Sequence, residues 1–165
     1  MAPMHKSVAA VSFAALLAFT GTAFTTAAWA IAGVDFPTYN FKECQKAVDA
    51  GDFKKALPMV SELSKFEPEN PEVLSMLGYV QRNNGLMDEA MASYNKALSF
   101  KADHMGALEY QGELFLKLND KASAEANLAK LKTICPTGCE AHDVLQAAIE
   151  RSKDGDFQWT AHKAK

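Results

Sequence analysis

The sequence has none of the short motifs by which many enzymes are recognised. It contains no glycine-rich phosphate loop, no dinucleotide-binding glycine fingerprint, no His-Glu-x-x-His pair and no Gly-x-Ser-x-Gly turn. Its acidic residues are scattered, as expected of solvated helix surfaces, rather than gathered into one cluster. We therefore expect a protein that is not an enzyme and that needs no cofactor.

An excess of charge and a large number of cysteines are also absent. The chain has 17 Lys and Arg against 20 Asp and Glu, a net charge of −3, and no basic stripe. This composition argues against nucleic acid as a partner. Only three cysteines occur, and none belongs to the Cys-x-x-Cys-His signature of haem attachment.

The N-terminus carries a long uncharged segment. Residues 7–34 follow Lys6 without a single charge, and they include the small-x-small pattern Ala28-Trp29-Ala30. This is the layout of a secretory signal, so we predict a signal peptide over residues 1–30 and a periplasmic or secreted mature protein with no membrane contact. The alternative is a retained membrane anchor, because the run is long enough to span a bilayer, although alanine and threonine make it only weakly apolar.

Three sets of residues recur every 34 positions in the rest of the chain. The sets are Ala56, Ala90 and Ala124; Gly51, Gly85 and Asn119; and Phe66, Phe100 and Ile134. A fixed period of this length indicates stacked structural repeats, and such stacks are typically binding surfaces. We predict one repeat domain over residues 37–152, with units at 37–70, 71–104 and 105–138.

Each unit divides into two apolar stretches around a break of glycine, asparagine or aspartate. Spacings of three and four within the stretches predict a pair of helices per unit. Asn70 is expected to cap the helix that begins with Pro71. A capping helix is predicted over residues 139–152, with Thr137 and Glu140 as its capping box. Residues 153–165 lack apolar periodicity and are interpreted as a disordered tail.

The pattern resembles the tetratricopeptide repeat family, most clearly in the middle unit. Leu77-Gly78, Ala90, Tyr94 and Ala97 stand where that family has leucine-glycine, alanine, an aromatic residue and alanine. The resemblance implies an all-α fold, an α-solenoid of three tetratricopeptide helix pairs plus a C-terminal capping helix. It also implies a right-handed superhelix with a concave groove.

The resemblance further implies that the first helix of each pair lines a partner-binding groove. The groove residues by register are Phe41, Gln45, Val48, Ser75, Tyr79, Arg82, Glu109, Glu113, Leu116 and Lys117. This mixed set suits an extended peptide with apolar and basic features; the alternative is that these are ordinary solvated helix faces.

Some members of this family bind acidic chaperone tails through a clamp of lysine, asparagine and arginine. The matching positions here hold Phe41, Gln45, Met76, Gly106 and Tyr110. The clamp is therefore absent, and such tails are not the expected partner.

Cys135 and Cys139 enclose the only short segment with possible chemistry. In an exported chain, two cysteines this close predict a structural disulfide. One alternative is thiol redox activity, although the spacing is not Cys-x-x-Cys. The other is a metal site formed by Cys135, Cys139 and His142, with ligands suited to copper(I) or to a partial zinc site. Cys44 stands at a small-residue position of the repeat, so buried packing accounts for it.

We predict an exported, periplasmic adaptor or scaffold that binds a protein or peptide partner, in the assembly of an envelope complex. The alternative is a metal or thiol-redox accessory protein that uses the Cys135, Cys139 and His142 loop. A third possibility, self-assembly through the repeat faces, needs exposed apolar residues on the end helices, and the sequence shows few.

Overall fold

A computed structural model describes residues 36–152 of the chain. This part folds into seven helices and contains no strand. The helices are α1 (Phe41–Asp49), α2 (Phe53–Phe66), α3 (Pro71–Asn83), α4 (Met87–Phe100), α5 (Met105–Lys117), α6 (Lys121–Ile134) and α7 (Glu140–Ser152). The predicted signal peptide and the predicted disordered tail lie outside the described residues. No helix in the described range has the length and apolarity needed to cross a membrane.

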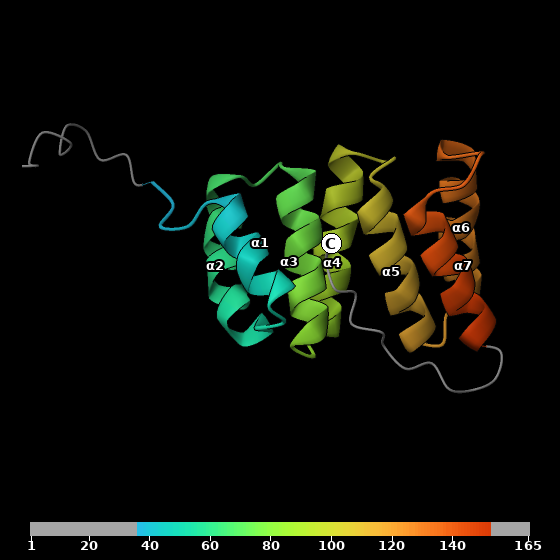
Figure 1. The fold of residues 1–165 in the computed structure, drawn as a ribbon, viewed down its shortest axis with the longest axis horizontal. Helices are drawn as coiled ribbons and strands as arrows, with labels where there is room; N and C mark the ends of the chain where they lie inside the picture. The colour runs from blue at the N-terminus through green and yellow to red at the C-terminus, as the bar shows by residue number, and fades with distance from the viewer. Residues whose placement is uncertain (1–35, 153–165) are drawn as a thin grey trace, which may run out of the picture. The chain divides into compact units, whose positions relative to one another are not determined.

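The helices pack as consecutive pairs, as the all-α solenoid prediction requires. Each helix from α1 to α6 contacts the next one along the chain, and α7 packs on both α5 and α6. Figure 1 shows α1, α3, α5 and α7 in the layer facing the viewer, with α2, α4 and α6 behind them. The first helices of the pairs therefore share one face, which we call the first-helix face.

Turn chemistry explains where the paired helices separate. Gly51, Gly85 and Asn119 all adopt positive φ, at 71°, 83° and 61°. Glycine and asparagine tolerate this left-handed conformation, so the 34-residue repeat of these residues reflects one turn made three times. The next helix is then capped by Asp52 or Asp120, whose side chains accept from the N–H groups of Lys55 and Ser123.

The predicted start of α3 is confirmed. The Asn70 side chain accepts a hydrogen bond from the Glu72 N–H at 3.0 Å, and Pro71 occupies the first helical position. The capping helix predicted over residues 139–152 is present as α7, but its predicted capping box, Thr137 with Glu140, is wrong. Helix α7 begins at Glu140, and the Asp143 N–H donates to the Cys139 carbonyl at 3.0 Å. Cys139 rather than Thr137 therefore precedes the helix, because Gly138, at φ 95°, prolongs the turn.

Small residues lie where neighbouring helices approach most closely. Ala56, Ala90 and Ala124 are completely buried. At Gly78 an added Cβ would lie 2.6 Å from Tyr94 Cε1, and at Gly112 it would lie 2.6 Å from Leu145 Cδ2. The Tyr94 and Leu145 side chains thus pack directly on helix backbone, which only glycine permits. Cys44, at the corresponding position of the first unit, is also fully buried.

The third repeating set marks the ends of the second helices. Phe66, Phe100 and Ile134 are the last residues of α2, α4 and α6. Phe66 and Phe100 remain 40% and 47% exposed. They recur because each ends the second helix of a pair, and they are not part of the core. The core itself is built from four adjoining apolar clusters along the stack, one of which joins α5, α6 and α7 through Leu108, Leu131 and Leu145.

Candidate functional site: a pocket on the first-helix face

A pocket opens on the first-helix face between α1, α3 and the start of α5. Its cavity volume is about 250 Å³. It is lined by Phe41, Gln45, Val48, Glu72, Ser75, Met76, Tyr79, Lys101, Asp103, His104, Met105, Gly106 and Tyr110. All three helix pairs contribute residues, so the pocket exists only when the units are stacked. We call it the α1–α3–α5 pocket.

The inner wall of this pocket is aromatic. The Tyr79 and Tyr110 rings lie 4.8 Å apart between centroids, and Phe53 stands edge-on to Tyr79 at 5.7 Å. Burial raises the pKa of both Tyr79 and Tyr110 above the ordinary tyrosine value. Both hydroxyls therefore stay neutral at physiological pH, and the wall offers apolar ring surface with uncharged polar edges.

A polar lip at the other side is organised by His104. This residue is the N-cap of α5, and its Nδ1 accepts a hydrogen bond from the Ala107 N–H at 3.0 Å. A neutral ring that accepts at Nδ1 carries its hydrogen on Nε2. That atom is 3.1 Å from Glu72 Oε2, close but not aligned as a hydrogen bond. Glu72, Asp103 and Lys101 complete the lip, which is net acidic.

The charged residues deeper on the same face pair with each other. Arg82 Nη1 donates to Glu113 Oε2 at 2.8 Å and to the Tyr110 carbonyl at 3.0 Å. The guanidinium carbon lies 5.1 Å from the centre of the Tyr79 ring and 5.6 Å from that of Tyr110. Arg82 thus ties α3 to α5 through an ion pair, a backbone contact and two aromatic rings.

The predicted groove residues fall into separate places. Phe41, Gln45, Val48, Ser75 and Tyr79 line the α1–α3–α5 pocket. Arg82 and Glu113 form the buried pair. Glu109 lines a second pocket, between α5 and α7. Leu116 is buried in the core beside α7, and Lys117 is exposed at the end of α5. Their role in partner binding stays a prediction.

Sequence reasoning missed part of the pocket, although one signal pointed to it. The lip residues Glu72, Lys101, Asp103, His104 and Met105 come from a helix start and from the connection between α4 and α5. They do not fall in the first-helix register from which the groove was derived. The five positions that match the family's clamp, however, all line the pocket. Those positions, rather than the helix register alone, would have located it.

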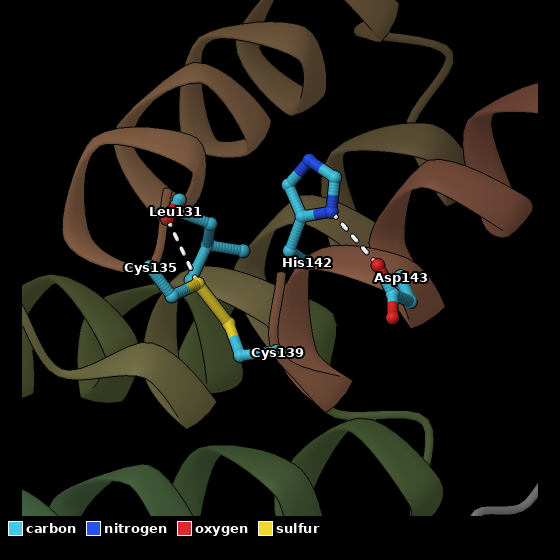
Figure 2. Close-up of a disulfide and its surroundings, with 5 residues drawn as sticks. All are labelled: Leu131, Cys135, Cys139, His142 and Asp143. Carbon is cyan, nitrogen blue, oxygen red and sulfur yellow. Dashed lines mark hydrogen bonds and ion pairs between the residues drawn. A yellow bond between two sulfur atoms is a disulfide. The ribbon is translucent and has the colours of Figure 1, made fainter. Parts of the chain in front are cut away.

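Cys135 and Cys139 form a disulfide in the loop before α7 (Figure 2). Cys135 Sγ lies 3.0 Å from the Leu131 carbonyl oxygen, which places the disulfide against the end of α6. A disulfide has no thiolate to give a metal ion. His142 Nδ1 instead contacts Asp143 Oδ1 at 3.0 Å. Within residues 36–152, no three His, Cys, Asp or Glu side chains gather as a metal site.

Cys44 is separate from this loop. It is fully buried in α1, and burial is the main cause that raises the pKa of its thiol. A neutral thiol shielded from solvent reacts slowly with oxidants and alkylating reagents. Cys44 therefore acts as a small core residue, as its place in the repeat predicted.

Stacked helix pairs with a pocket across three of their first helices are the architecture of an α-solenoid repeat protein. Residues 42–104 match the sequence model of the family described as Tetratricopeptide repeat. Residues 42–104 therefore match tetratricopeptide repeats, and repeats of this kind typically mediate protein–protein interaction. No curated protein matches the chain closely enough to add a more specific identity.

Proposed function

We propose that this protein is a non-catalytic adaptor that binds an extended segment of a partner protein along the first-helix face. The partner places one apolar side chain, aromatic or long aliphatic, in the α1–α3–α5 pocket. The observation that carries this proposal is the pocket itself, about 250 Å³ in volume and lined by three helix pairs. An anchor residue in a concave apolar site is the usual centre of a protein–peptide interface.

Two features of the pocket support a peptide over a small charged ligand. The wall formed by Phe41, Val48, Met76, Tyr79 and Tyr110 is mainly apolar, so the anchor gains affinity by desolvation. The lip carries both carboxylates and an ammonium group, which can contact the backbone or polar side chains on either side of the anchor. The net acidic lip favours a basic residue next to it.

The location that we propose is the periplasm or the extracellular space, after removal of residues 1–30. The uncharged segment ending at Ala30 supports this proposal, and so does a disulfide, which persists in oxidising compartments. In that compartment, the first-helix face would serve a scaffold in an envelope complex. The test is the N-terminus of the protein recovered from its cell: Ile31 supports export with cleavage, whereas Met1 or Ala2 contradicts it.

The binding proposal is tested with a display library of random 12-residue peptides selected on the full chain. Selected peptides are expected to share one aromatic or long aliphatic position. Fluorescence polarisation then measures their affinity for Phe41→Ala with Met105→Ala, two pocket residues that are 38% and 43% exposed. Because both are partly exposed, the fold should survive while affinity falls at least about tenfold.

The matched control is Phe66→Ala with Leu118→Ala. These residues are 40% and 49% exposed and lie outside the pocket. Peptide affinity should remain within about twofold of the unchanged chain. Peptides that lose affinity for the control and keep it for the pocket variant would place the binding site elsewhere.

A further inference from the structure

Helix α7 ends at Ser152, on the first-helix face beside α5. Gly112 of α5 packs on Leu145 of α7, and the second pocket joins Met105 and Gly106 of α5 to Glu140 and Ala141 of α7. The residues of α7 in these contacts increase in number as those of α5 increase, so α5 and α7 are parallel. Ser152, the last residue of α7, is therefore near the level at which α5 ends, and residues 153–165 continue from there.

The sequence of residues 153–165 matches the chemistry of this face. Phe157 and Trp159 are large aromatic residues, and they are followed by His162, Lys163 and Lys165. The face offers the aromatic pair Tyr79 and Tyr110, followed toward the helix starts by the carboxylates of Asp103 and Glu72, with Lys101 beside them. Arg82 adds little net positive charge because Glu113 pairs with it. The tail sequence therefore has aromatic residues followed by basic residues, and the face has aromatic residues followed by a net acidic lip.

We propose that residues 153–165 bind in the first-helix face of their own chain, with Trp159 against the Tyr79–Tyr110 wall and the terminal lysines over the acidic lip. The inference rests on the proposed function of this face as a peptide-binding surface. It is an alternative to the expectation of a disordered tail, which stays a prediction. A sequence without helical periodicity is suited to bind as an extended chain.

The length of the tail permits this path. Seven residues separate Ser152 from Trp159, and an extended chain of that length spans at most about 23–25 Å. Along the helix axes, Tyr110 lies about nine residues before the end of α7. At the usual rise per residue this is an axial distance of roughly 14 Å. One helix-to-helix step adds about 10 Å across. The direct path is thus roughly 17 Å, within reach of Trp159.

A tail bound to the face of its own chain would weaken the binding of a partner to that face. A tail joined by a short connection acts at an effective concentration in the millimolar range. A partner must therefore displace the tail. The apparent affinity of the partner equals its intrinsic affinity multiplied by the fraction of time that the face is free. If the tail is bound about nine-tenths of the time, Phe157→Ala with Trp159→Ala should raise the affinity of a groove-binding peptide about tenfold.

The experiment uses tryptophan fluorescence of the full chain. Trp29→Phe leaves Trp159 as the only tryptophan, because the chain has two. Acrylamide quenching of Trp159 is compared with that of a synthetic peptide of residues 153–165. We expect several-fold weaker quenching and blue-shifted emission in the chain. Glu72→Lys with Asp103→Lys, both exposed, should restore quenching toward the peptide value.

The matched control is Glu89→Lys with Glu125→Lys, two exposed carboxylates on the second helices α4 and α6. It makes the same change in net charge and should leave Trp159 protected. Circular dichroism verifies that both variants are folded. Protection that survives the lip variant but is lost in the control would overturn the proposal.

Two further results would also overturn it. Quenching equal to that of the free peptide means that the tail is not bound. Protection that disappears on dilution means that the tail occupies a second copy of the chain instead of its own. The proposed function is judged separately, by binding of the display peptides: if they bind the pocket while Trp159 is unprotected, only the tail inference fails, and if neither occurs, both fail.

Discussion

Arg82 Nη1 lies 2.8 Å from Glu113 Oε2, and this pair joins the first helix of the second repeat to the first helix of the third. Both side chains are at most 3% exposed. Repeat stacks are held together by contacts between neighbours, so an ion pair at a junction contributes both to stability and to the register of the stack. The same pair also fixes the Tyr110 backbone and hence one wall of the α1–α3–α5 pocket.

Removal of one partner should destabilise the protein strongly. Glu113→Ala removes the carboxylate that pairs with the buried Arg82 guanidinium, and breaking a buried pair in this way typically costs about 3–5 kcal/mol. Arg82→Met with Glu113→Leu should recover most of that loss, because it removes both charges. The free energy of unfolding from urea titration measures the effect.

The control for this prediction is Glu125→Ala. Glu125 is 3.7 Å from Lys121, and both side chains are largely exposed. An exposed pair of this kind contributes about 0.3–0.5 kcal/mol. A Glu113→Ala protein as stable as the Glu125→Ala protein would show that the Arg82–Glu113 pair does not hold the junction.

Two glycines on neighbouring first helices should respond in opposite ways to alanine. Gly78→Ala places a Cβ 2.6 Å from the buried Tyr94 ring, and overpacking of this kind costs about 1–3 kcal/mol. At Gly106 the nearest atom is His104 Cε1 at 3.5 Å, an ordinary contact. Gly106→Ala should therefore stabilise α5 by about 0.4–1 kcal/mol through its effect on the unfolded chain. Thermal unfolding by circular dichroism distinguishes the signs; equal melting temperatures would contradict the packing described here.

The hydroxyl of Tyr94 adds nothing to stability. Tyr94 is completely buried, and its hydroxyl has no hydrogen-bond partner among the described residues. An unsatisfied buried hydroxyl costs about 1–3 kcal/mol, so Tyr94→Phe should be neutral or stabilising. Tyr94→Ala, which also removes the ring from Gly78, should instead cost about 3–5 kcal/mol. A clear loss of stability in Tyr94→Phe would mean that the hydroxyl has a partner after all.

Thiol counting should separate three states of the cysteines. The native full chain should show almost no fast-reacting thiol, because Cys44 is buried with a raised pKa and the other two cysteines are bonded. Unfolding without reductant should expose one thiol, and unfolding with reductant should expose all three. Three thiols in the unreduced protein, together with bound copper or zinc, would instead support a metal role for the Cys135–Cys139 loop.

The repeat architecture could be read from the sequence because it depends on local rules applied three times. The turn residues Gly51, Gly85 and Asn119 are required by a backbone conformation, and Ala56, Ala90 and Ala124 by close helix packing. The requirement for a left-handed turn residue and the requirement for a small residue both arise from residues of the same repeat. The capping box of α7 was misplaced at Thr137, because whether Gly138 continues a turn or begins a helix depends on the disulfide loop around it.

The amino-acid sequence by itself determined the helices and their pairing, since periodicity and turn chemistry act over a few residues. The face that the first helices share was implied by the resemblance to tetratricopeptide repeats. Only the tertiary structure decided which charges on that face are available to a ligand. Arg82 and Glu113 occupy the same repeat positions as Val48 and Gln45, yet they pair with each other while the latter two line the pocket. That difference depends on distances between side chains that are far apart in the sequence, and helical periodicity gives no information about such distances.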